Sequence, residues 1–234
     1  MNTPHITLAV ESIAVPDYLS QTYWWAYVHP RAVHVFERQW LVNLILWGNF
    51  NRLRDSALNA LGTELTGLTL QVACVYGDLT NRLAERVGPD ARLDVVDVLP
   101  IQLHNLARKL PPDAPVTLLH GDSAALDLPT ASYDRALLFF LLHEQPEATR
   151  RATLAEVLRL VKPGGSIVIV DYHRPHPLNP LFVLMAGVLR LLEPFARDLW
   201  SHEITEWFPA DAKVATIEKK TIFAGLYQLI TITV

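Results

Sequence analysis

The chain has 234 residues, a formal net charge of −4 and a single cysteine, Cys74. This length suits one α/β domain with added segments and is enough to bury a substantial core. The acidic balance, without any run rich in lysine and arginine, speaks against a nucleic-acid partner, and one cysteine excludes an intramolecular disulfide framework and fits a reducing compartment.

The sequence shows neither a targeting segment nor a membrane-spanning one. Its first residues lack the charged region and apolar core of a secretory signal, and no apolar stretch approaches the roughly 20 residues that a spanning helix requires. Hydrophobic residues nevertheless make up 50% of the chain. We therefore expect a cytoplasmic protein whose surface associates peripherally with the inner membrane.

Residues 1–67 are predicted to form an aromatic-rich helical extension. The stretch 18–62 has helical spacing, which Pro30 and Gly48 are expected to interrupt. The tryptophans and tyrosines of residues 18–50 suit plain packing. They equally suit a lid over a lipid-soluble substrate, because Trp and Tyr favour places where one edge is apolar and the other is wet.

From residue 68 to residue 234 the pattern changes to strands that alternate with helices. Short, nearly continuous apolar strands are typical of a parallel sheet covered on both faces. We therefore predict an α/β domain with a doubly wound, mostly parallel, seven-stranded sheet. The expected strands are 69–75, 92–98, 115–120, 134–142 and 166–171, and the expected helices are 79–87, 100–110 and 147–161, the last ending before the turn signal KPGG.

Two further segments follow the fifth strand. Residues 177–208 are predicted to be an apolar helical insertion, with a helix pair over 180–200. The tail, 212–234, is predicted to form two closing strands that pair antiparallel.

In such sheets the ligand lies outside the carboxyl ends of the strands, so the residues that follow each strand are the candidates for a site. Gly77 lies after the first strand, in a loop with only one glycine, and Asp97 ends the second strand. Asp97 lies about 20 residues after Gly77, which is the spacing at which an acid can bind ribose hydroxyls. The other candidates beside a cofactor are Val75, Tyr76, Asp78, Val98, Asp122 and Ser123.

Structural roles for these residues stay open. Asp97 would also suit a cap on the following helix, and Asp122 a cap on a turn. Tyr76 would also suit the core, although a tyrosine beside Gly77 favours a role in a site.

The order of these motifs resembles that of class I S-adenosylmethionine-dependent methyltransferases, especially the quinone-biosynthesis branch. Three stretches within residues 69–175 carry the resemblance: TLQVACVYGDLT, GDSAALDLPTASYDRALLFFLLHEQP and LAEVLRLVKPGGSIVIVDYHRP. The resemblance implies that S-adenosylmethionine binds here. It would place Asp97 on the ribose diol, Asp122 and Ser123 near the adenine, and Gly77 under the cofactor.

The first of these stretches departs from that branch around the methionine end of the cofactor. Cys74 and Val75 replace two glycines, Tyr76 replaces a small residue, and Gln71 stands where the motif has an acid. Each added Cβ limits how closely the backbone approaches a ligand. The altered loop, with LDVVDVLPIQL and LEPFARDLW, resembles the rhodoquinone-biosynthesis methyltransferase-like proteins.

That narrower resemblance implies a reaction other than methylation. The family converts ubiquinone to rhodoquinone by exchanging a ring methoxy group for an amino group, with S-adenosylmethionine as amino donor and a divalent metal, manganese, assisting. The partners would be a lipid-soluble quinone and a membrane surface. Two alternatives stay open: a conventional quinone C- or O-methyltransferase, and a lipid-binding or regulatory protein with a decayed cofactor site.

His143 and Glu144 follow the fourth strand, and Asp171 and His173 follow the fifth. Imidazole and carboxylate suit manganese, zinc or iron, and ends of adjacent strands lie about 4.8 Å apart. We therefore predict these four residues as metal ligands, with His143 and Tyr76 as the groups that transfer protons. The alternative for each is a structural role, such as Asp171 capping the strand end.

Overall fold

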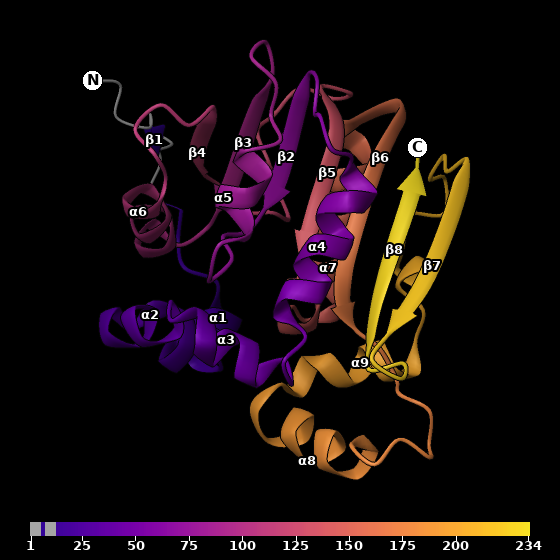
Figure 1. Cartoon of the computed structure of the whole chain (residues 1–234). Coiled ribbons are helices and arrows are strands. Elements are labelled where there is room, and N and C mark those ends of the chain that lie inside the picture. The colour runs from indigo at the N-terminus through magenta and orange to yellow at the C-terminus, as the bar shows by residue number, and fades with distance from the viewer. Residues whose placement is uncertain (1–5, 8–12) are drawn as a thin grey trace.

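The computed structural model describes residues 6–7 and 13–234. Within those residues a single sheet of eight strands forms the centre of the molecule, in the order β1-β4-β3-β2-β5-β6-β8-β7 (Figure 1). The strands are β1 (Ile6–Thr7), β2 (Leu68–Val72), β3 (Arg92–Asp97), β4 (Val116–His120), β5 (Tyr133–Phe139), β6 (Val161–Tyr172), β7 (Thr216–Ile222) and β8 (Tyr227–Thr233).

Neighbouring strands from β1 to β6 run parallel, and β8 pairs antiparallel with β6 and with the edge strand β7. This confirms the predicted doubly wound, mostly parallel sheet of seven strands, to which the two-residue β1 adds a short edge. The apolar runs explain the arrangement. Residues 136–139 of β5 are all buried, as expected for a strand that helices cover on both faces.

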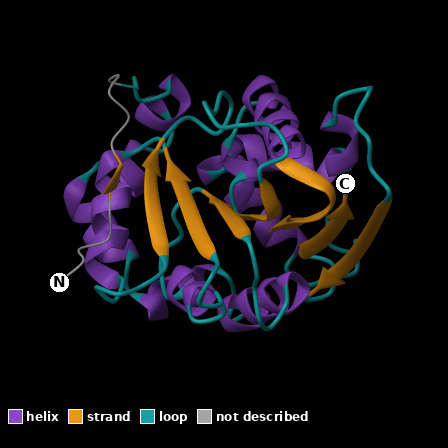
Figure 2. Ribbon diagram, turned by 90° about the horizontal axis from the view of Figure 1, so that it is seen from above, coloured by secondary structure: helices purple, strands orange, loops and turns teal. Residues whose placement is uncertain are grey.

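Helices cover both faces of the sheet (Figure 2). Among them, α4 buries Phe50, Leu53 and Leu58 and packs against β5 and β6. The α-helices are α1 (Asp17–Gln21), α2 (Pro30–Phe36), α3 (Gln39–Ile45), α4 (Phe50–Leu61), α5 (Leu79–Ala84), α6 (Pro100–Lys109), α7 (Glu147–Leu160), α8 (Phe182–Leu192) and α9 (Asp198–Ser201). Shorter helical turns are η1 (Trp24–Val28), η2 (Leu142–Glu144), η3 (Pro194–Arg197) and η4 (Ile204–Trp207).

Two strands end earlier than predicted. The first ends at Val72 instead of residue 75, and the fourth ends at Phe139 instead of residue 142. The next residue has a positive φ in both cases, 71° at Ala73 and 53° at Phe140. This left-handed conformation takes the backbone out of the strand and into the loop that faces the site.

The segments around the fifth predicted strand also differ from expectation. KPGG is not a separate turn but part of β6, with a shift of pairing register opposite Tyr133 and Arg135. The helix predicted for 79–87 ends at Ala84. The helix pair predicted for 180–200 is one helix, α8, followed by the short η3 and α9, because Pro194 cannot continue α8.

Helices α1, α2, α3 and α8 lie across the carboxyl ends of the parallel strands, whereas α4 packs against β5 and β6 (Figure 1). The predicted interruptions occur as expected: Pro30 is the first residue of α2, and Gly48, with a φ of 75°, lies between α3 and α4. Among the described residues we find no helix that is long and apolar enough to cross a membrane.

Candidate active site

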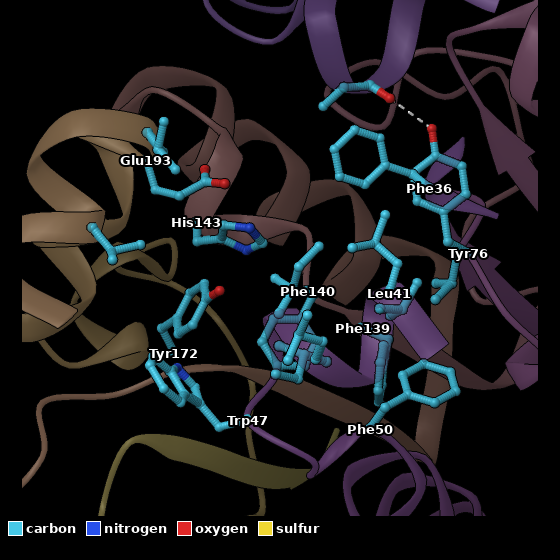
Figure 3. A pocket seen from close by; sticks show the side chains of 18 of the residues that line it. Phe36, Leu41, Trp47, Phe50, Tyr76, Phe139, Phe140, His143, Tyr172 and Glu193 are labelled. Atoms are coloured by element: carbon cyan, nitrogen blue, oxygen red, sulfur yellow. Dashed lines mark hydrogen bonds between the residues drawn. The ribbon is translucent and has the colours of Figure 1, made fainter. Parts of the chain in front are cut away.

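An apolar pocket lies where α3 and α8 cross the ends of β5 and β6 (Figure 3). Its volume is about 520 Å³, within the range of roughly 300–1,000 Å³ that ligand pockets have. Aromatic and aliphatic side chains from segments far apart in the sequence form most of the wall. They include Trp25, Phe36, Trp47, Phe139, Phe140 and Met185.

Three polar side chains line one side of this pocket. They are His143 of η2, Tyr172 at the end of β6, and Glu193, which follows α8. The Glu193 carboxylate lies beside the His143 imidazole (Figure 3), and one of its oxygens, Oε2, is buried without a hydrogen-bond partner. An apolar ligand with a polar ring edge would place that edge against these groups.

The charge of His143 depends on the acids around it. Burial disfavours the protonated ring and lowers the pKa of His143. The nearby Asp171 carboxylate, whose Oδ1 lies 3.0 Å from Nδ1 of His143, has the opposite and larger effect, to which Glu193 adds. The pKa of His143 therefore rises to about 9. Burial also raises the pKa of Glu193, while His143 and a hydrogen bond from Tyr23 oppose that rise. At neutral pH His143 is therefore a cation and a hydrogen-bond donor.

A second hollow adjoins the ends of β3 and β4, and four predicted cofactor residues, Asp97, Val98, Asp122 and Ser123, line it. The free volume is only about 50 Å³, and Tyr18 and Leu19 of α1 also form its wall. A nucleoside needs more room than this. The chemistry of the hollow fits the adenosine part of S-adenosylmethionine, but α1 has to move to admit it.

Asp97 connects the first two loops. Its carboxylate accepts hydrogen bonds from the backbone N–H groups of Cys74, at 2.7 Å, and Leu99, at 2.8 Å. Burial raises the pKa of Asp97 to about 6, although both amides oppose the rise. Leu99 immediately precedes α6, so the bond to its amide also suits the alternative that Asp97 caps this helix, while Asp97 lines the hollow as well.

Asp122 and Ser123 already have partners within the chain. Asp122 accepts a hydrogen bond from Ala124 N at 2.9 Å, as the turn-cap interpretation requires. The Ser123 hydroxyl lies 2.9 Å from Thr153 Oγ1 and accepts a bond from Gln145. Both residues therefore shape the hollow in addition to lining it.

Residues of the loop after β2 line the two hollows or lie at the protein surface. Val75 and Tyr76 line the apolar pocket. The Tyr76 hydroxyl donates to Ala26 O at 2.8 Å (Figure 3) and accepts from Gln102 at 2.7 Å. Asp78 lines neither hollow and instead pairs with Arg54 at 2.7 Å.

Position 77 requires a glycine, because the backbone there lies close to the ring of Phe50. The φ of Gly77 is 84°, and a Cβ there would lie 2.9 Å from Phe50 Cζ. Gln71, which replaces the acid of the motif, is buried, donates to Ala73 O and accepts from Thr80. At the position of the motif's acid, the start of the altered loop is thus held by neutral hydrogen bonds.

The structure does not assemble the four predicted metal ligands. The Asp171 carboxylate accepts from the backbone amides of Leu142, His143 and Tyr172, which makes it the cap of η2. His173 lies apart, with Nδ1 2.8 Å from Gly225 O. Across residues 6–7 and 13–234 no three His, Cys, Asp or Glu side chains are placed to hold one metal ion, so these residues do not fit manganese.

Sequence reasoning missed Glu193. The signal was present, because a single carboxylate follows the apolar run VLMAGVLRLL and precedes Pro194. Only the fold shows that this acid lies beside His143, fifty residues away in the chain. Trp25 and Ala26 were likewise expected only as parts of a general lid.

The comparisons with known proteins decide the family. A methyltransferase-domain family model matches residues 69–165. The demethylmenaquinone methyltransferase of Lactococcus lactis is 31% identical over 185 residues, which cover 74% of this chain and 70% of that protein. The chain belongs to the class I S-adenosylmethionine-dependent methyltransferases. The protein of the same name from Bacillus licheniformis is 26% identical over 184 residues, or 75% of this chain and 78% of that one.

Solved structures of methyltransferases share the fold. Human N-acetylserotonin methyltransferase in complex with S-adenosylmethionine has a TM-score of 0.61 and 16% identity over 94% of this chain and 60% of the human chain. The N-methyltransferase NodS of Bradyrhizobium japonicum has a TM-score of 0.57 and 13% identity over 79% of this chain and 97% of NodS.

Proposed function

We propose that the protein transfers a group from S-adenosylmethionine to the ring of a lipid-soluble quinone. The observation that carries this proposal is the apolar pocket of about 520 Å³, with His143 and Glu193 on one side. A prenylated ring requires such a wall for its apolar part and a few polar groups for its oxygens. The relatives named demethylmenaquinone methyltransferase support a quinone as the substrate class.

We assign cofactor binding to the ends of β2, β3 and β4. Bound S-adenosylmethionine would supply the transferred group. Asp97 would accept hydrogen bonds from the ribose, and Asp122 and Ser123 would lie near the adenine. Val75 and Tyr76 line the pocket that the methionine end would share with the substrate.

His143 and Glu193 are assigned to the chemistry. His143, protonated beside Asp171, would donate a hydrogen bond to a ring oxygen and stabilise negative charge as the new bond forms. Glu193 would accept the proton that leaves the reacting group. The Tyr76 hydroxyl already bonds Ala26 and Gln102, so we propose that it orients the loop before any role in proton transfer.

We propose further that the transferred group is the amino group, as in the conversion of ubiquinone to rhodoquinone. The ring carbon would bond to the donor's amine nitrogen and lose its methoxy group, which takes up a proton and leaves as methanol. The bond between that nitrogen and the donor's carbon would then break, with loss of a neighbouring C–H proton to a base.

The altered loop supports the choice of the amino group, because Cys74, Val75 and Tyr76 change the surroundings of the cofactor's methionine end, where the amine lies. The protein would act as a peripheral protein on the cytoplasmic side of the inner membrane. The resemblance that implies amination also implies manganese, which the described residues do not fit.

Turnover by isosteric variants tests the pocket. The purified protein is incubated with S-adenosylmethionine and either ubiquinone or demethylmenaquinone, and the quinones are separated by mass. Glu193→Gln is expected to lower turnover by about 100-fold or more, the usual size of a lost proton-transfer group. Glu218→Gln, an exposed acid of β7, is the matched control. Equal turnover in both variants would remove Glu193 from the chemistry.

A further inference from the structure

Three arginine side chains surround a third hollow, which lies beside α8. Arg174 follows β6, Arg190 lies in the last turn of α8, and Arg197 ends η3. The hollow has a volume of about 480 Å³. Its wall also contains Trp200, whose indole Nε1 is buried without a hydrogen-bond partner. Three cationic donor groups from separate segments therefore line one space.

The acids that are close in sequence do not neutralise these arginines. Asp198 pairs with Arg150 at 3.4 Å, and Glu203 pairs with Lys219 at 2.6 Å. Glu193 faces the apolar pocket, beside His143 (Figure 3). Three like charges around one space repel one another. Guanidinium groups in this arrangement match a phosphate group, which they bind through paired, charge-assisted hydrogen bonds.

An unusually exposed apolar edge lies next to the hollow. On α8, Val183 is 79% exposed, Leu184 is 50% exposed and Leu191 is 81% exposed. Helical spacing places these three residues on one face, away from the buried Met185 and Leu189. An apolar helix face flanked by cationic side chains is the pattern of a helix that lies in the headgroup region of a bilayer.

We propose that α8 docks on a bilayer of anionic phospholipid. The exposed apolar side chains of α8 would enter the boundary between lipid headgroups and acyl chains. The three arginines around the hollow would bind lipid phosphate groups. Met185 and Val188, on another face of α8, line the apolar pocket, so docking brings that pocket to the membrane. Docking itself does not depend on the chemistry; only the passage of a lipid-soluble substrate rests on the proposed function.

Vesicle binding tests the docking surface, in the absence of cofactor and quinone. Sedimentation with phosphatidylcholine vesicles is compared with sedimentation when phosphatidylglycerol is included, and we expect binding to require the anionic lipid. Arg190→Gln and Arg197→Gln should each weaken binding about five-fold, since a basic residue at such a surface contributes roughly 1 kcal/mol. Arg108→Gln, an exposed arginine of α6, removes the same charge elsewhere and should change binding little.

Three results would overturn the proposal. One is equal binding to both kinds of vesicle, and another is an equal effect of Arg190→Gln and Arg108→Gln. The third is binding of inorganic phosphate to the wild-type protein without any binding to anionic vesicles, which would assign the hollow to a soluble phosphate. Turnover of a short-tailed quinone is measured in parallel. If that turnover persists while vesicles do not bind, docking fails and the proposed function stands.

Discussion

At the scale of single residues, Asp97 carries the cofactor assignment. Its carboxylate is held by the amides of Cys74 and Leu99 and faces the hollow beside β3 and β4. Asp97→Asn should weaken S-adenosylmethionine binding on the order of tenfold or more, because a hydrogen bond to a charged group contributes about 1.5–3 kcal/mol. Titration calorimetry measures this, with the exposed Asp90→Asn as control. Unchanged affinity would remove Asp97 from the site.

His143 predicts a pH dependence of stability. Its pKa rises on folding from 6.5 to about 9, so the stability that its protonated form contributes is complete below pH 6.5 and is lost as pH rises through 9. The free energy of unfolding should therefore fall across that window by about 1–3 kcal/mol more in the wild-type protein than in His143→Gln. Urea unfolding at a series of pH values measures the difference. Parallel profiles would contradict a protonated His143.

The residue scale also shows where prediction from sequence stops. The position of Asp97 could be predicted because a strand end identifies it, and it lines the hollow beside β3 and β4. The position of Asp78 could not be predicted, since its ion pair with Arg54 depends on how α4 packs. The metal prediction lacks support from the described residues for a similar reason: backbone amides of η2 donate to Asp171, and His173 lies beside Gly225.

At the scale of elements, the loop after β2 makes the amination proposal testable. Val75 lines the apolar pocket, and Cys74 bonds Asp97 through its backbone. Cys74→Gly with Val75→Gly should lower amino transfer more than cofactor affinity, because only side-chain bulk near the methionine end is removed. Turnover and calorimetry on the same preparation separate the two effects. Equal losses would mean that the loop only supports the fold.

We propose that helix α1 controls entry to the cofactor hollow. Leu19 is buried and lines that hollow with Tyr18, where only about 50 Å³ is free. Tyr18→Ala with Leu19→Ala should raise the association rate of S-adenosylmethionine severalfold, because α1 no longer has to leave before the ligand enters. Stopped-flow fluorescence measures the rate. An unchanged rate would show that α1 already moves freely.

The elements themselves were largely predictable. Apolar runs of five to eight residues between turn signals identify buried parallel strands without any tertiary information. Their ends were not predictable, because the positive φ of Ala73 and Phe140 is imposed by the loops they enter. The turns η1 and η3 likewise have no sequence pattern of their own.

At the scale of the whole molecule, the extension and the sheet act as one site. Glu37, which follows α2, accepts hydrogen bonds from Gly77 N at 3.1 Å and from Lys109 at 2.7 Å. Helix α4 lies within the predicted extension 1–67, yet Phe50 and Leu53 belong to the core of the α/β domain. We therefore propose that only the segment before α4 is a lid, and that 68–234 needs α4 to fold.

The central claim is group transfer from S-adenosylmethionine to a quinone ring, with the amino group as the group transferred. The most direct measurement uses S-adenosylmethionine that carries heavy nitrogen in its amine and heavy carbon in its methyl group. Ubiquinone is incubated with it and the protein, with and without manganese, and the quinones are analysed by mass. We predict a product that has lost one methoxy group and gained heavy nitrogen without heavy carbon. Heavy carbon in the ring product would contradict amination, and no labelled quinone from ubiquinone or demethylmenaquinone would contradict group transfer itself.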